Sequence, residues 1–172
     1  MTIDGLFSEA LRLIKDHIQF AGPLVFALGL GEGIPGLSLL IPSTALFVAI
    51  GGAHGAAGGE FVTLWLAASC GAVIGDCIAY TLGRWLRDDV ARLKYFAVHP
   101  DALSRGHDLF ERWGAFAVLG GKFTGFVRPF IPVVAGIVTM PFALFLVSSI
   151  VSSLAWAGVF LAPGYGLTWA LN

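Results

Sequence analysis

The last quarter of the chain, from Pro129 to Asn172, contains no charged side chain. A second tract, from Phe61 to Leu82, is 22 residues long and carries one charged residue, Asp76. A bilayer crossing needs about 20 consecutive apolar residues in a helix. Across the chain 57% of residues are hydrophobic and 12% are charged, too few charges to cover the surface of a soluble domain. The sequence therefore predicts an integral membrane protein.

The remaining tracts complete a single membrane domain over residues 1–172. Residues 1–20 predict an amphipathic helix in the membrane interface, because apolar residues recur at helical spacing with Glu9, Arg12, Lys15 and Asp16 largely opposite. Residues 21–53 are apolar but are interrupted by Glu32, 33-GIPG-36 and Pro42, which favours two half-helices in a re-entrant hairpin over one straight span. The expected order continues with a transmembrane helix at 61–83, a charged segment at 84–112, a second re-entrant hairpin at 113–139 and a transmembrane helix at 142–161, ended by 163-PGYG-166.

The charged segment at 84–112 sets the expected orientation. It holds six of the ten Lys and Arg residues, so the positive-inside rule places it in the cytoplasm. The predicted fold class is thus an all-α polytopic membrane protein, with two broken-helix hairpins that are each followed by a transmembrane helix.

The two hairpins show a faint internal repeat. Glu32 precedes Pro42 by ten residues, and Lys122 precedes Pro132 by ten residues. In each case a short apolar segment ending in glycine follows the proline, and a plain apolar span comes next. A pair of broken helices in corresponding positions points to a transporter binding site.

Four charged residues lie within the apolar tracts: Glu32, Asp76, Lys122 and Arg128. A charge within the membrane costs about 2.5–3.5 kcal/mol on insertion scales, so each is a functional candidate. The alternative is that the two acids and two bases form structural ion pairs that hold the hairpins together, most of all at Asp76, which shares a helical face with Tyr80.

The functional interpretation is a cationic site for a phosphate. Arginine bonds two phosphate oxygens with its planar fork, lysine acts as a point charge, and broken helices offer unpaired backbone N–H groups. Glu32 is a candidate to exchange a proton beside these cations. An amphipathic phosphate such as a lipid phosphate suits this combination.

Enzymatic chemistry has little support in the sequence. No HExxH, GxSxG or CxxC motif occurs, and the four histidines are scattered and expected to be solvated: His17, His54, His99 and His107. Lys122-x5-Arg128-Pro129 is one residue short of a membrane-phosphatase signature and lacks its histidine partners. The chain is expected to be no enzyme and to use no cofactor or metal. Nucleic acid is not an expected partner either, because no basic arm is present.

Several ordered motifs resemble the DedA family, whose shared region is called the VTT domain. They are Glu32 before a Gly/Pro-rich break and Pro42, then 71-GAVIGDCIAYTLGR-84, 110-FERWG-114 and 120-GGKFTGFVRPFIPVVAGIVTM-140, with Trp156 in the last span. These motifs include the supporting positions Gly75, Tyr80, Arg84, Pro132 and Gly136. The resemblance covers about residues 20–165.

The resemblance implies a lipid translocase in the bacterial cytoplasmic (inner) membrane. Family members are implicated in returning undecaprenyl phosphate to the cytoplasmic leaflet and in moving phospholipids, several with dependence on the proton motive force. By position, Glu32 matches an essential acid of the family and Arg128 an essential arginine. Lys122 stands where arginine is usual, which keeps the charge but loses the fork. Thr44 stands where many members carry a second acid, and Asp76 is a candidate substitute.

The sequence thus predicts a flippase-like or scramblase-like protein that moves undecaprenyl phosphate or a phospholipid. Lys122 and Arg128 would bind the lipid phosphate, and Glu32 and Asp76 would couple protons or gate the site. Membrane lipids are the expected partners, and protons and a homodimer are left open as further ones. The alternatives are a transporter of small ions or solutes and a non-transporting membrane scaffold.

Overall fold

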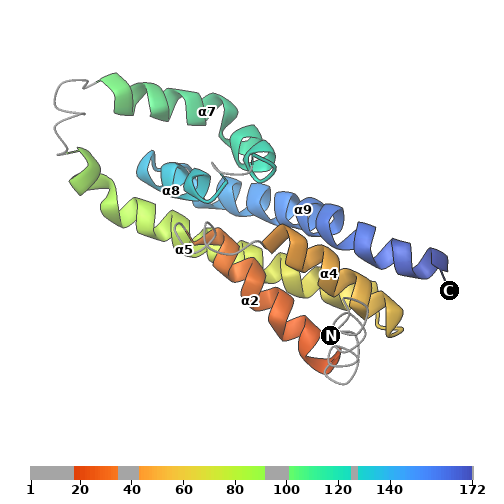
Figure 1. Ribbon diagram of the computed structural model, residues 1–172. Helices are drawn as coiled ribbons and strands as arrows, with labels where there is room; N and C mark the ends of the chain where they lie inside the picture. Colours follow the sequence, from red (N-terminus) through yellow and green to blue (C-terminus); the bar gives the residue numbers. More distant parts are fainter. Residues whose placement is uncertain (1–17, 35–42, 92–100, 125–127, 172) are drawn as a thin grey trace.

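All regular secondary structure in the described part of the chain is helical. The computed structural model describes residues 18–34, 43–91, 101–124 and 128–171. Its elements are η1 (Ile18–Phe20), α2 (Ala21–Gly33), α4 (Ser43–Ala56), α5 (Phe61–Ala91), α7 (Asp101–Gly121), α8 (Phe130–Ile137) and α9 (Phe142–Leu171) (Figure 1). The expected amphipathic helix at 1–20 lies outside the described residues except for the short η1.

The two long helices, α5 and α9, form the centre of the molecule. They run in opposite directions and pack against each other (Figure 1). Phe61–Arg87 of α5 and Phe142–Gly166 of α9 are long and apolar enough to cross a membrane. These two candidate membrane-spanning helices coincide with the two apolar tracts in the sequence.

Both long helices continue beyond their expected ends. Helix α5 passes Gly83 and reaches Ala91, because the charged residues after Gly83 include no helix breaker. Helix α9 passes Leu161 and continues through Pro163 to Leu171. A proline is tolerated within a membrane helix where neighbouring helices and local adjustment satisfy the freed carbonyl group. The expectation that 163-PGYG-166 ends the helix is therefore wrong.

The other α-helices are shorter than α5 and α9, and the first of them, α2, ends at the Gly/Pro-rich stretch that predicts a helix break. Helices α2 and α4 have 13 and 14 residues, about 20 Å each at 1.5 Å per residue, too short for a hydrocarbon core of about 30 Å. Helix α2 ends where Ile34 turns extended, and Pro42 lies outside the described residues. In the second half α7 already begins at Asp101, upstream of the expected start at 113, and the short α8 follows.

The helices of the two halves exchange partners. In each half the first of the other two helices packs against the long helix of its own half, α2 against α5 and the 21-residue α7 against α9. The second packs against the long helix of the other half, α4 against α9 and α8 against α5 (Figure 1). This matching arrangement supports the internal repeat and interlocks the two halves around α5 and α9.

Two apolar clusters form the core, one towards each end of the long helices. One centres on Trp156 and Phe47, whose rings meet edge to face at 4.9 Å. The other centres on Tyr80 and Phe145, whose rings stack at 4.5 Å. Between the clusters, in the order of residues along α5 and α9, lies a buried polar layer that contains Asp76 and the serines of α9.

Candidate functional site

The first buried charge pair joins Asp76 to Lys122. Asp76 lies at the middle of α5, and Lys122 follows directly on α7; they are 4% and 6% exposed. The Lys122 Nζ atom lies 2.5 Å from Asp76 Oδ2. Ser149 donates a hydrogen bond to the same oxygen at 2.6 Å, and Lys122 also donates to Ser153 Oγ. The pair is therefore held by hydroxyl groups from α9.

The second pair joins Glu32 to Arg128. Glu32 lies in the last turn of α2 and Arg128 just before α8, and Nη1 of the arginine pairs with Oε2 of the glutamate. The Arg128 guanidinium carbon lies 4.0 Å from the centroid of the Trp156 ring, a cation–π contact. The Nη2 atom of Arg128 is buried and has no hydrogen-bond partner among the described residues.

The two pairs are neighbours at the middle of the long helices. Gly33, next to Glu32, approaches α5 so closely that an added Cβ would lie 2.6 Å from the Asp76 nitrogen. On α9, Ser153, which contacts Lys122, and Trp156, which contacts Arg128, are one helical turn apart. The structure thus brings together all four charged residues that the sequence singles out. Each pair also joins the two halves, because Glu32 and Asp76 come from the first half and Arg128 and Lys122 from the second.

The supporting motif residues position the helices around these pairs. Gly75 admits α2 and Gly136 admits α8, since an added Cβ at either would meet backbone of the neighbouring helix. Tyr80 donates a hydrogen bond to the Met140 carbonyl oxygen at 2.5 Å and accepts one from Arg84 at 3.2 Å. Together these contacts seat α8 and the turn after it on α5.

Three other sequence candidates have different settings. Thr44 is exposed in the first turn of α4, so its side chain does not join the buried charged layer. Pro132 is buried in the first turn of α8, where a proline costs no helical hydrogen bond. His54 is buried on α4, with Nε2 3.2 Å from the Glu60 carbonyl oxygen, so its expected solvation is wrong. The turn after α4 covers the ring, since an added Cβ at Gly59 would lie 2.4 Å from His54 Nε2.

Sequence reasoning missed the serines of α9. Ser148, Ser149, Ser152 and Ser153 are all buried. The pattern 148-SSIVSS-153 puts Ser149 and Ser153 on one helical face, four residues apart in an apolar helix. That spacing was the available signal.

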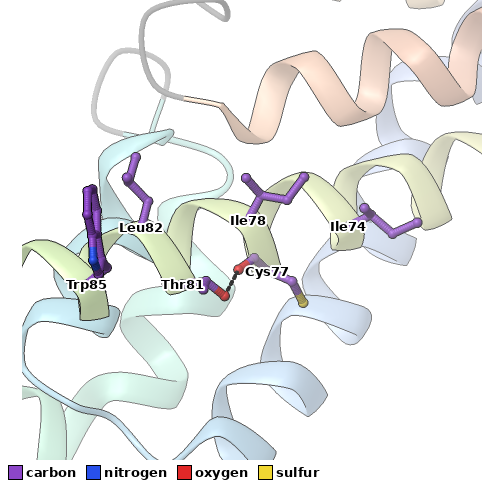
Figure 2. Close-up of a pocket in the computed structure, with 6 residues that line it drawn as sticks. All are labelled: Ile74, Cys77, Ile78, Thr81, Leu82 and Trp85. Atoms are coloured by element: carbon purple, nitrogen blue, oxygen red, sulfur yellow. Dashed lines mark hydrogen bonds between the residues drawn. The ribbon is translucent and has the colours of Figure 1, made fainter.

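An apolar groove runs along the outer face of α5. It has a volume of about 530 Å³ and is lined by Ile74, Cys77, Ile78, Thr81, Leu82 and Trp85 (Figure 2). The Thr81 hydroxyl, the polar group of this lining, is bonded to the Cys77 carbonyl oxygen at 2.7 Å. Cys77 follows Asp76, so the groove begins beside the charged layer.

These features define a class: a helical membrane protein with two long spans, broken short helices and two ion pairs buried at mid-span. The VTT domain model matches residues 41–166. The Escherichia coli inner membrane protein YabI is 29% identical over 77% of this chain and 52% of its own length. The membrane proteins slr0232 of Synechocystis and Mb2670 of Mycobacterium bovis are each 32% identical, over 85% and 84% of this chain and 66% and 70% of their own lengths.

The chain belongs to the VTT-domain family, also called the DedA family. It is a membrane protein, and it spans only about half the length of YabI. No solved structure matches it.

Proposed function

We propose that this protein moves a phosphate-bearing lipid, an undecaprenyl phosphate or a phospholipid, between the leaflets of a bacterial inner membrane. The observation that carries the proposal is Arg128: a guanidinium 11% exposed at mid-span, fixed by Glu32 and Trp156, with Nη2 lacking a partner in the described part of the chain. The protein does this as a transporter and not as an enzyme.

The Arg128 site suits a phosphate monoester or diester. Nη2 is ready to donate to one phosphate oxygen, and displacement of Glu32 frees Nη1 for a second, which gives the two-oxygen contact that arginine favours. The displaced Glu32 carboxylate then sits in a low-dielectric layer, where taking up a proton removes the cost of its charge. Phosphate binding and proton uptake are linked in this way.

Lys122 has a secondary role in phosphate binding. An ammonium has three donors, and Lys122 already directs two of them to Asp76 and Ser153. Lys122 can therefore bind a phosphate held at Arg128 with all three donors only after the Asp76–Lys122 pair opens. Asp76 thereby acts as a gate.

The surroundings favour a lipid over a soluble anion. The groove beside Asp76 is almost wholly apolar and is lined by six α5 side chains, which include the large exposed hydrophobic residues Ile74, Ile78, Leu82 and Trp85 (Figure 2). Such a lining suits an acyl or prenyl chain and offers nothing to a hydrated ion. The proposal includes α2–α4 and α7–α8 as re-entrant hairpins and segment 84–112 on the cytoplasmic side.

The test is transport by purified protein in liposomes that contain labelled undecaprenyl phosphate or labelled phospholipid. Wild type should speed movement of at least one lipid, and Arg128→Ala should abolish it. Arg87→Ala is the matched control, because Arg87 is an exposed arginine near the end of α5. If protein-free vesicles move both lipids equally fast, the translocase proposal fails.

One observation favours the scaffold alternative. Each buried cation is already neutralised by a buried acid, which is what purely structural pairs would show. Under that alternative, Arg128→Ala would unfold the protein, whereas the translocase proposal expects a monodisperse but inactive variant.

A further inference from the structure

The oxygen atoms around Lys122 have a chemistry of their own, beyond the gating role proposed for Asp76. The Lys122 ammonium donates to Asp76 Oδ2 and to the Ser153 hydroxyl oxygen, and the Ser149 hydroxyl donates to the same Asp76 oxygen. The two serines are 0% exposed, and the aspartate is 4% exposed. Two oxygen atoms from two helices therefore contact a single cation at mid-span, and a third, from Ser149, is hydrogen-bonded to one of them.

We propose that Asp76, Ser149 and Ser153 form a binding site for one monovalent cation, which the Lys122 ammonium occupies and which an alkali cation occupies when Lys122 is withdrawn. Carboxylate and hydroxyl oxygens are the ligands that hard cations prefer. The Ser149 hydroxyl donates a hydrogen bond to Asp76 and keeps its lone pairs for a cation. The Ser153 hydroxyl oxygen already accepts a hydrogen bond from the Lys122 ammonium.

The charge balance explains why the site needs an occupant. An ionised Asp76 at this depth has a large desolvation cost unless a cation is next to it. Lys122 supplies that cation from the turn directly after α7, so any movement of α7 away from α9 would carry the ammonium away. A sodium or potassium ion entering the vacated space would keep the layer neutral while the halves separate.

The test uses Lys122→Ala, which removes the ammonium and leaves Asp76, Ser149 and Ser153 in place. Thermal unfolding of the purified protein in detergent is measured in sodium, potassium and choline chloride at equal concentration. The variant should unfold several degrees higher in sodium or potassium than in choline, with a shift that saturates as the salt concentration rises. Wild type should show no such difference, because its site is filled.

Two further variants check that the cation binds at these ligands. Adding Asp76→Asn to Lys122→Ala should abolish the shift, and adding Ser153→Ala should reduce it. Methylammonium chloride should stabilise Lys122→Ala above choline chloride as well, since it restores the lost ammonium.

The proposal is overturned if folded Lys122→Ala unfolds at the same temperature in all the salts. It is also overturned if Lys122→Ala aggregates in sodium while the double variant with Asp76→Asn folds, because the cation then fails to compensate Asp76. The readout involves no lipid, so its failure and the failure of the translocase proposal are independent.

Discussion

At the scale of single residues, the two buried cations differ in how many of their hydrogen-bond donors remain free for a ligand. Lys122 donates to an acid and to a serine hydroxyl, whereas Arg128 keeps a nitrogen without a partner among the described residues and contacts an aromatic face. A compact ammonium suits the first setting and a planar fork suits the second. The family resemblance implies arginine at position 122, but the surroundings in this structure fit lysine.

We therefore expect Lys122→Arg to lower the stability of the protein. The resemblance alone predicts that this change is tolerated or beneficial, but Ser149 and Ser153 are fully buried and leave little room for a larger planar group. Overpacking of this kind costs about 1–3 kcal/mol. Thermal unfolding in detergent measures it, and Ser153→Ala in the same chain should restore part of the loss. Equal stability together with faster lipid transport would show that position 122 binds the phosphate directly.

The site residues were predictable from the sequence to different degrees. Glu32, Asp76, Lys122 and Arg128 stand out because charges are rare in apolar tracts. Their pairing was not predictable, because it depends on α8 crossing to the long helix of the other half. The serines gave a weak signal, since serine in a helix often bonds only its own backbone, as Ser148 does with the Leu144 carbonyl oxygen.

At the scale of helices, close backbone contacts decide where the short helices sit. Gly136 of α8 leaves room for the backbone of Tyr80 and Arg84 on α5, with an added Cβ 2.8 Å from the Arg84 nitrogen. Gly120 in the last turn of α7 has nothing within 4 Å of such a Cβ.

Gly136→Ala should therefore destabilise the protein, by about 1–3 kcal/mol if α8 has to shift. Gly120→Ala is the matched control and should be neutral or slightly stabilising, because alanine favours helices over glycine by about 1 kcal/mol. The comparison is made by thermal unfolding of both variants in one detergent. An equal effect of the two changes would mean that α8 does not pack closely on α5.

The groove on α5 supports a second prediction at this scale. Ile78 lines it and is 46% exposed, and Leu66 on the same helix lies outside it with 45% exposure. Ile78→Trp should fill the groove and slow lipid movement in liposomes several-fold, while Leu66→Trp should leave the rate unchanged. Identical rates would remove the groove from the path of the lipid chain.

The presence of the helices could be predicted from the sequence more reliably than the residues at which they end. The apolar tracts gave α5 and α9, and the breakers between Gly33 and Pro42 gave the interruption after α2. The extension of α9 through Pro163 was not predictable, because the packing of α4 along that part of α9 supports a helix that proline alone would end.

At the scale of the whole molecule, both ion pairs tie the first half of the chain to the second. Glu32 and Asp76 belong to α2 and α5, and their partners follow α7 or precede α8. Movement of one half against the other would therefore require both pairs to open. Transporters built from paired broken helices move in this way.

Variants of the Glu32–Arg128 pair can separate a structural role of the polar layer from a role in lipid transport. Glu32→Gln alone leaves the buried Arg128 without its counter-charge, a loss that typically costs about 3–5 kcal/mol. The double variant Glu32→Gln, Arg128→Gln removes both charges and should unfold at a temperature close to that of wild type, because neither buried charge remains to be compensated. Thermal unfolding of the single and double variants gives this comparison.

Lipid transport by the double variant then decides between translocase and scaffold. If Arg128 binds the phosphate, the double variant should be stable but inactive, and its inactivity cannot be assigned to unfolding. The single Glu32→Gln variant keeps the proposed phosphate ligand, so where it folds it should transport without the pH dependence that proton uptake by Glu32 would give to wild type. A stable double variant that transports as fast as wild type would mean that the pair only holds the halves together.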